Sequence, residues 1–474
     1  MQRPRTLRSG GLPGISPEYG GLQRDTCEGR PPRDGDGSTA WGERVPRAGY
    51  HSCKRRIIGR FTSAAVEEVM TDLGLRRHDV PTNLIQKWSA ADDPDSSRCP
   101  FRAAGKLHQG PPVFFNTAQD ARNGAAEGAW VVTRVELQRE VLQDPELFSS
   151  AGISGFSGML GEGWPLMPLE LDPPVHGKYR GLLNKLFSPA RINELDAGVR
   201  AQAKDLIGTI ATHRRCEFVD SFGRPFPVGV FLRLLGLPVD QMDMFRAWED
   251  DMMHSSVPAT RLNAARTLEA YLKSLIAERR ATPTDDLVSF LVTSTLDDEA
   301  LSDEAILGIC FFFFIAGLDT VAATLGFIFR DLAENPHLQR RLRAAPETIP
   351  NAMEEMIRAY GAVTTSRYLT RDHVFHGIAM RNGDRVVVPL GVGGRDPTEF
   401  AQPNLLDFDR QITRNISFGA GPHRCIGSHL ARREIKIALE EWIKAIPEFR
   451  LDLSRPPKVN AVTVWGFEHL SLVW

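Results

Sequence analysis

The longest apolar run of the chain extends from Ile306 to Phe329. Ser302 stands just before it as a candidate N-terminal cap, and Asn335-Pro336 follows as a stop signal. We therefore predict one helix of about 32 residues, which at about 1.5 Å per residue would be about 48 Å long. A run of this length and composition is typical either of a membrane span or of a helix that is buried on all sides of a globular core.

Polar residues inside the run favour the globular core. Asp319, Thr320 and Thr324 interrupt the apolar residues, and an aspartate in mid-membrane costs roughly 2.5–3.5 kcal/mol. The run also lies between polar segments with helical periodicity. We therefore expect a central buried helix and no membrane anchor.

Within this helix, Ala316-Gly317-Leu318-Asp319-Thr320 is the unusual stretch. Glycine weakens a helix by about 1 kcal/mol relative to alanine. A threonine hydroxyl can bond back to a carbonyl and open the helical ladder, and such openings are frequent at functional sites. An acid beside an alcohol in an apolar environment indicates a proton relay. The alternative is a kinked helix with a satisfied polar pair and no chemical role.

The rest of the pattern is mostly helical. Helical periodicity covers most of residues 190–360, and Arg385–Pro389 is typical of a short strand. Residues 1 to about 60 are rich in Arg, Gly and Pro and show no hydrophobic period, so we expect residues 1–79 to form a disordered extension. No apolar secretory signal begins the chain.

Composition excludes several classes of function. With 474 residues and a net charge of −2, the chain has no long-range attraction for nucleic acid or anionic lipid. Its 6 cysteines form no C-x-x-C pair, which argues against a zinc finger or a disulfide framework and is typical of a reducing cytoplasm.

One cysteine has a distinctive setting, in Phe418-Gly-Ala-Gly-Pro-His423-Arg-Cys425-Ile-Gly427. Apolar positions recur at helical spacing after it, so the glycine-rich loop places Cys425 near a helix start, where the helix dipole favours a thiolate. The glycines allow a flat, bulky partner to approach the sulfur. A thiolate is one of the few protein ligands of haem iron. Alternatively, Cys425 is a structural cysteine that ends a turn.

The spacing F-x-x-G-x-H-x-C-x-G resembles the haem-binding loop of the cytochrome P450 family, and A-G-x-D-T resembles its oxygen-activation segment. The resemblance implies that Cys425 is the axial ligand of a haem b, that Phe418 packs beside the sulfur, and that Gly427 lets the haem approach. It also implies that Thr320 assists oxygen activation while Asp319 helps to deliver protons.

Further residues match the family's motifs. Glu355 and Arg358 match its E-x-x-R pair, and Arg410 resembles the third member of that buried structural network. The resemblance assigns the haem propionates to four side chains, which are His176, Arg180, Arg367 and His423. Arginine suits carboxylates because its planar fork binds them in a bidentate manner. Any one of these residues alone could equally be a surface cation.

The resemblance covers residues 80–474 and implies a single large domain, mainly α-helical with small β-sheets. Within the family, the chain is most similar to soluble bacterial camphor-type monooxygenases, through Leu369–Gly377 and Cys425–Ile435. It implies an oxidoreductase that uses O2 and receives electrons from a [2Fe-2S] ferredoxin and its reductase. No sequence for a fused reductase is present.

The expected substrate pocket is apolar. Trp164 stands where the camphor-type enzyme uses a tyrosine to bond a substrate ketone, and a tryptophan can donate through its indole N–H. The remaining lining candidates are Phe312, Ile315, Ala316 and Val363. They predict a compact hydrophobic substrate of terpenoid or aromatic type, and not camphor itself.

Two other functions remain open at this stage. A peroxygenase would take hydrogen peroxide directly and would not need the acid–alcohol pair. A non-catalytic haem-thiolate sensor would need the cysteine loop, but neither Asp319-Thr320 nor an open apolar pocket.

Overall fold

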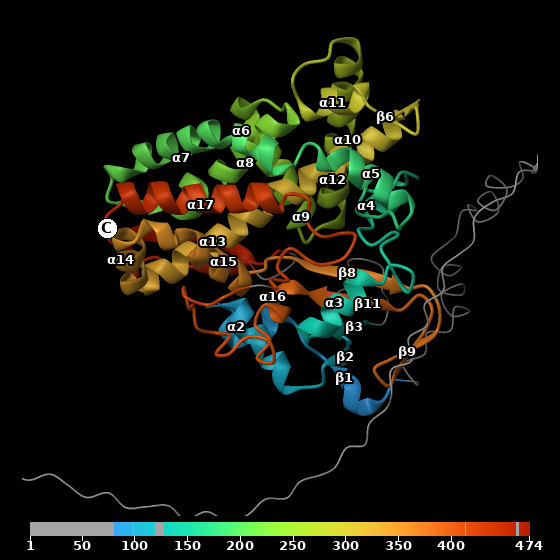
Figure 1. Ribbon diagram of the computed structural model, residues 1–474, viewed down its shortest axis with the longest axis horizontal. Coiled ribbons are helices and arrows are strands. Elements are labelled where there is room, and N and C mark those ends of the chain that lie inside the picture. Colours follow the sequence, from blue (N-terminus) through green and yellow to red (C-terminus); the bar gives the residue numbers. More distant parts are fainter. Residues whose placement is uncertain (1–79, 98, 119–127, 413, 461–463) are drawn as a thin grey trace, which may run out of the picture. The chain divides into compact units, whose positions relative to one another are not determined.

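The computed structural model describes residues 80–97, 99–118, 128–412, 414–460 and 464–474. The predicted extension, residues 1–79, lies outside the described residues. The described residues, from Val80 onward, belong to one compact unit. Its helices dominate, as predicted, and the strands form small sheets (Figure 1).

The helices that the structure describes follow one another along the chain in this order: α2 Pro100–Gly105, α3 Val135–Gln143, α4 Phe156–Leu160, α5 Val175–Asn184, α6 Pro189–Glu194, α7 Asp196–Ala211, α8 Pro225–Leu235, α9 Met242–Met253, α10 Pro258–Ala281, α11 Leu287–Thr293, α12 Asp303–Leu318, α13 Thr320–Glu334, α14 Pro336–Ala344, α15 Ile349–Ala359, α16 Leu390–Gly393 and α17 Ser428–Ala445.

The largest sheet has six strands in the order β1-β2-β3-β11-β8-β4. The predicted strand Arg385–Pro389 is β11, which pairs parallel with β3 and antiparallel with β8. The strands of this sheet are β1 Ile85–Gln86, β2 Val113–Asn116, β3 Ala129–Val132, β4 Phe148–Ser149, β8 Thr364–Leu369 and β11.

The other sheets have two or three short strands each. These strands are β5 Arg215–Glu217, β6 Thr295–Leu296, β7 Glu299–Ala300, β9 His373–Phe375, β10 Ile378–Met380, β12 Arg450–Leu451, β13 Lys458–Asn460, β14 Gly466–His469 and β15 Ser471–Val473. Three of them, β5, β6 and β7, interrupt the helical region 190–360 that the periodicity predicted.

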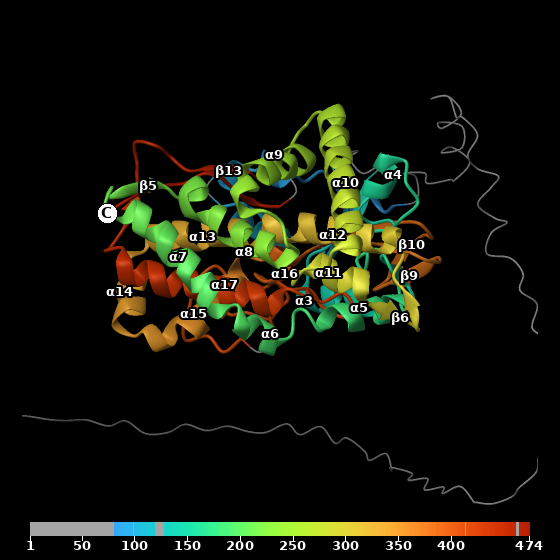
Figure 2. The same ribbon diagram turned by 90° about the horizontal axis from the view of Figure 1, so that it is seen from above.

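The apolar run forms the centre of the helical part, as predicted. Ser302 caps α12 by accepting a hydrogen bond from the backbone N–H of Ala305 at 3.1 Å, and α13 ends one residue before Asn335. By length and composition Asp303–Glu334 could span a membrane, but 72% of its most apolar window is buried inside the protein. Figure 2 shows α10 crossing α12, and α17 runs beside α7 in both views.

The predicted single helix is interrupted at one residue. Asp319 separates α12 from α13, with backbone angles φ −103° and ψ −32°. The Thr320 hydroxyl donates to the carbonyl of Ala316 at 3.2 Å, which is the back-bond that the sequence suggested. Gly317 is required just before the break, because a Cβ there would lie 2.4 Å from the ring of Phe231 on α8.

Candidate functional site

The loop before α17 holds Cys425 by backbone geometry. Gly419 and Gly421 adopt positive φ angles of 71° and 67°, which favour glycine. At Gly421 a Cβ would also meet the carbonyl oxygen of Leu142 at 2.1 Å. The backbone N–H of Cys425 donates to the carbonyl of Phe418 at 2.8 Å, so the loop closes immediately before the helix.

Cys425 is an exposed residue, although protein atoms surround its thiol. Burial among these atoms raises the thiol pKa, against the opposing effect of the Gly427 N–H and the charges of Arg180, Arg424 and Arg432. The backbone N–H of Gly427 acts in the direction that the helix-start argument predicted, but burial outweighs it. A bound metal cation would supply the missing stabilisation, because a thiol that coordinates a metal loses its proton.

A cluster of cationic and donor side chains lies near this loop. The rings of His176 on α5 and His423 in the cysteine loop are 4.2 Å apart, and the Nε2 atoms of both are buried without a hydrogen-bond partner among the described residues. Arg367 on β8 is 3% exposed, and its Nη1 donates only to Thr365 Oγ1 and Ser366 O in the part of the chain described.

The charge of Asp172 offsets only part of the cost of burying this cluster. Burial, followed by the charges of Arg367, His176 and Arg180, lowers the pKa of His423 to about 3. Burial also lowers the pKa of Arg367 to about 10. Two acidic groups would offset the free-energy cost of burying the charged forms of His423 and Arg367, since a buried cation is stable when it is paired. The cluster therefore fits a ligand with carboxylates, such as the propionates of haem.

One face of the central helix is accessible within an otherwise buried element. Phe312, Ile315, Ala316 and Thr320 are partly accessible, whereas Phe311 is fully buried. The spacing of the four accessible residues places them on one side of the helix. This side can line a cavity.

The other two predicted pocket residues have different settings. Val363, between α15 and β8, is partly accessible. Trp164 is 4% exposed and its ring lies 5.4 Å from that of Phe311. The Trp164 Nε1 is buried without a partner among the described residues, so it can donate one hydrogen bond.

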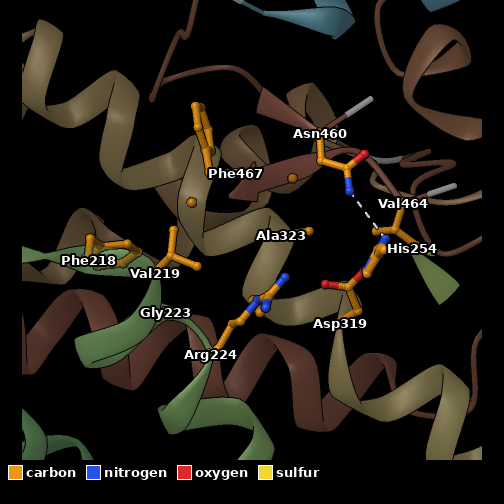
Figure 3. Close-up of a pocket in the computed structure, with 13 residues that line it drawn as sticks. Phe218, Val219, Gly223, Arg224, His254, Asp319, Ala323, Asn460, Val464 and Phe467 are labelled. Atoms are coloured by element: carbon orange, nitrogen blue, oxygen red, sulfur yellow. Dashed lines mark hydrogen bonds and ion pairs between the residues drawn. The ribbon is translucent and has the colours of Figure 1, made fainter. Parts of the chain in front are cut away.

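Behind the helix break lies a small enclosed cavity of about 20 Å³. Figure 3 shows Arg224, His254 and Asp319 pointing into it, with Asn460 beside His254. The Nε2 of His254, which ends α9, lies 3.3 Å from Asp319 Oδ2 and 3.7 Å from Glu249 Oε1.

The surroundings shift the pKa values of Glu249 and His254. Burial and the charge of Asp319 raise the pKa of Glu249 to about 8. Burial alone would lower the pKa of His254, but the contact with Asp319 and the charges of Asp319 and Glu249 outweigh it and raise this pKa. Asp319 therefore has an ionisable neighbour on the side that faces away from Thr320.

Sequence reasoning missed these neighbours of Asp319. Glu249 and His254 lie on another helix, at no characteristic spacing from Asp319, so no local signal identifies them. Arg432 was also missed, although it follows Cys425 on the predicted helix, and its guanidinium lies 4.4 Å from the centre of the Phe418 ring.

The E-x-x-R residues form a buried ion pair. Arg358 Nε lies 2.7 Å from Glu355 Oε2, and both side chains are 0% exposed. Arg410 Nε lies 3.1 Å from Glu355 Oε1, as the third member of the network. Glu355 Oε1 also accepts the backbone N–H of Asp407, and Arg358 donates to the carbonyl of Gly394 at 2.6 Å. The pair thus anchors two loop segments to α15.

Comparisons with known proteins agree with this geometry. The cytochrome P450 family model matches residues 240–460. A probable cytochrome P450 127A1 of Sinorhizobium fredii is 40% identical over 83% of this chain and 96% of its own length. The steroid C26-monooxygenase of Mycobacterium tuberculosis is 32% identical over 77% of this chain and 97% of its own length.

Solved structures show the same fold. Cytochrome P450 CYP101C1 is 29% identical, with a TM-score of 0.75 over 84% of this chain and 100% of that chain. CYP101J2 gives a TM-score of 0.73 at 29% identity, over 85% of this chain and 99% of that chain. The protein belongs to the cytochrome P450 family of haem-thiolate monooxygenases.

We predict that Arg358→Ala abolishes the recovery of folded, haem-containing protein. Removing one partner of a buried ion pair leaves an uncompensated charge and costs roughly 3–5 kcal/mol. The control is Arg191→Ala, which removes an exposed pair with the same i,i+3 spacing and the same 2.7 Å distance. An exposed pair contributes at most about 1 kcal/mol. The haem content and the thermal unfolding temperature of both variants are measured. An equal loss of haem and of stability in the two variants would contradict the prediction.

Proposed function

We propose that this protein is a monooxygenase that hydroxylates a compact hydrophobic, terpenoid-like substrate with O2 and with electrons from a [2Fe-2S] ferredoxin and its reductase. The observation that carries the proposal is the exposed Cys425 together with the buried Arg367 guanidinium and the Nε2 atoms of His176 and His423, which have no hydrogen-bond partner among the described residues. The apolar helix is mostly buried in the core, and a cytoplasmic location suits the free cysteines of the described residues.

The residues fit haem b. In this proposal Cys425 would bind the haem iron, while His176, Arg180, Arg367 and His423 would bind the propionates. Phe418 would pack beside the sulfur under the guanidinium of Arg432. Haem, when bound, supplies the dioxygen and electron-transfer chemistry, and the protein supplies position and protons.

Asp319 and Thr320 would manage the protons. The Thr320 hydroxyl can exchange its back-bond to the Ala316 carbonyl for a bond to another acceptor. Asp319 Oδ2 also lies 3.3 Å from His254 Nε2. A carboxylate between an alcohol and an imidazole can accept a proton from one and pass it to the other. This pair supports a monooxygenase over a peroxygenase or a sensor.

The accessible helix face would select the substrate. Phe312, Ile315, Ala316 and Val363 present apolar surface only, and Phe312 adds bulk. The named activities of relatives include a steroid C26-monooxygenase and a mycinamicin IV hydroxylase/epoxidase. We propose a more compact substrate for this chain, with the free Nε1–H of Trp164 as a donor to a substrate oxygen.

The first test concerns the axial ligand. In the ferrous protein with carbon monoxide, the strongly red-shifted Soret band of thiolate ligation should be present. We expect Cys425→His to lose it, because imidazole replaces sulfur as the ligand. The matched control is Cys216→Ser, at a partly buried cysteine outside the loop. A red-shifted band that survives in Cys425→His would exclude this ligand.

The second test concerns proton delivery. Thr320→Ala should divert electrons to hydrogen peroxide and lower product formation at least ~10-fold, since positioned proton transfer contributes typically 10²–10⁴-fold. Thr324→Ala is the control, because it removes a similar hydroxyl back-bond, to Thr320 O at 2.9 Å, one turn further on. Product and peroxide per reduced nicotinamide are measured. Full coupling in Thr320→Ala would contradict the role.

The third test concerns the substrate. In a spectral titration with monoterpenoids, small aromatics and steroids, a compact apolar compound other than camphor should give the largest low-to-high-spin shift. Close analogues should differ by 10- to 200-fold, because one methylene in such a pocket is worth about 1–3 kcal/mol.

Trp164→Phe then tests the polar contact. It should weaken the binding of carbonyl compounds by roughly 0.5–1.5 kcal/mol and leave hydrocarbons unchanged. Unchanged affinities throughout would place Trp164 outside the pocket, and a fullest shift with camphor would contradict the proposed preference.

A further inference from the structure

The acid at the helix break has a proton-carrying neighbour from a distant part of the chain. His254, which ends α9, places its Nε2 3.3 Å from Asp319 Oδ2. Glu249 Oε1, from α9 itself, lies 3.7 Å from the same nitrogen. Glu249 is 5% exposed, and this oxygen has no hydrogen-bond partner among the described residues. Three groups that can each hold and release a proton therefore meet at the junction of α12 and α13.

The small cavity at this junction has room for one water molecule. Its volume of about 20 Å³ exceeds the roughly 10–15 Å³ that a water requires. Arg224, His254, Asp319 and Asn460 line it (Figure 3), and a buried water needs about two to four polar partners of this kind. Within the part of the chain that the structure describes, His254 Nε2 makes no hydrogen bond of good geometry. When the ring is protonated, this nitrogen can therefore donate to a water in the cavity.

The His254 ring connects this cavity to solvent. The exposed fraction of the side chain falls from 41% at Asp250 to 14% at His254 and 10% at Asp319. Arg224 also lines the cavity, but a guanidinium does not release its proton near neutral pH. The imidazole can do so, and it touches both solvent and the buried acid.

The groups around the ring determine when it carries a proton. Ionisable or charged side chains face it, or lie close to it, from each neighbouring element: Asp319 at the α12–α13 junction, Glu249 and Asp250 on α9, Arg224 at the start of α8, and Arg261 on α10, whose Nε donates to the carbonyl of Met252. Asn460 on β13 is neutral and lies 3.3 Å from His254 Nδ1 through its Nδ2.

The balance of these groups keeps protons available near neutral pH. Burial lowers the pKa of His254, but the contact with Asp319 and the nearby carboxylate charges outweigh it, so this pKa lies above the ordinary value of 6.5. Burial and the charge of Asp319 raise the pKa of Glu249 to about 8, so Glu249 keeps its proton at pH 7. The charged form of His254 is lost as the pH rises through its raised pKa.

We propose that His254 is the positioning residue that supplies protons to Asp319, through the cavity that it shares with Arg224 and Asn460, with Glu249 as a second store of protons. This inference rests on the proposed function, because it concerns the source of the protons that Asp319 and Thr320 deliver. The imidazolium gives its Nε2 proton to the Asp319 carboxylate, directly or through one water. The neutral ring then regains a proton from solvent or from the Glu249 carboxyl group.

A pH profile of the holoenzyme tests this role. The consumption of reduced nicotinamide is followed between about pH 6 and pH 9, which brackets a raised histidine pKa. The assay contains a [2Fe-2S] ferredoxin, its reductase and limonene as a compact apolar probe. Consumption is counted whether it yields product or peroxide, so the assay does not depend on the identity of the substrate. In the wild type, the rate should fall as the pH rises through the pKa of His254.

His254→Gln should remove this pH dependence. Below pH 7 we expect the rate to fall at least ~10-fold, since positioned proton transfer contributes typically 10²–10⁴-fold. The solvent isotope effect in D2O should increase, because proton transfer then limits the rate. The control is His376→Gln, which changes the exposed pair of His376 Nε2 with Glu140 Oε2 at 2.8 Å and should keep the wild-type profile.

Glu249→Gln tests the second proton store. Glutamine keeps the shape of the neutral acid but cannot acquire the negative charge that stabilises the imidazolium 3.7 Å away. The fall in rate should therefore move to lower pH by about 1 unit, the lower end of the effect of an opposite charge at such a distance. An unmoved profile would exclude Glu249 from this role.

The protonation of His254 is measured independently of activity. In the ferrous carbon monoxide protein, the NMR signal of labelled His254, assigned by its absence from His254→Gln, should titrate above pH 6.5, and Asp319→Asn should lower this pKa. Titration at or below 6.5 would overturn the proposal. The carbon monoxide spectrum of each variant shows that it is folded.

Two further outcomes separate this inference from its alternatives. A slow His254→Gln with the wild-type pH dependence and isotope effect would overturn the proposal, and His254 would then only join α9 to the α12–α13 junction. Thr320→Ala is measured in the same assay. An uncoupled Thr320→Ala beside an unaffected His254→Gln would overturn this inference alone, whereas full coupling in Thr320→Ala would contradict the proposed function itself.

Discussion

The buried pair of Glu355 and Arg358 is the interaction on which the site's geometry depends. Two fully buried charges are stable only when every remaining donor and acceptor is used. Here the Glu355 carboxylate accepts hydrogen bonds from the backbone N–H of Asp407 and from Arg410 Nε, and Arg358 donates to the carbonyl of Gly394. The chain leading to the cysteine loop is therefore fixed to α15 at several points. Ser417, just before Phe418, adds another, since its hydroxyl donates to the carbonyl of Ile357 at 2.7 Å.

The two sides of the proposed haem site are built by different physical means. The cysteine side is a loop whose glycines allow turns and close contacts that other residues would obstruct, as at Gly421 against Leu142. The opposite side is a helix whose regularity is broken at Asp319. Arg367 is buried near the first side with few partners, and Glu249 Oε1 is buried behind the second without a hydrogen-bond partner among the described residues. Both imbalances are typical of places where a protein holds a ligand or moves a proton.

The parts of the fold that depend on local pattern could be predicted from the sequence. The strand Arg385–Pro389, the Ser302 cap and the stop before Asn335 were all confirmed. The family was also predictable, because the loop around Cys425 has a specific spacing. The interruption at Asp319 was only suggested, since a back-bonding threonine is compatible with a continuous helix as well.

What could not be predicted depends on contacts between distant segments. His254 and Glu249 approach Asp319 only because α9 packs near the helix break. The raised pKa of the Cys425 thiol follows from the protein atoms around it, which the helix-start argument did not include. The roles of Trp164 and Val363 in a pocket stay predictions.

The contact between Gly317 and Phe231 has a consequence for redesign of this protein. Space for a side chain at position 317 exists only if the aromatic ring of α8 is made smaller, because a Cβ would lie 2.4 Å from that ring. The two positions therefore behave as a compensating pair across two helices. A library that varies the lining of the substrate cavity on one helix alone will be filtered by this steric dependence, whereas joint variation of both positions opens shapes that single substitutions do not reach.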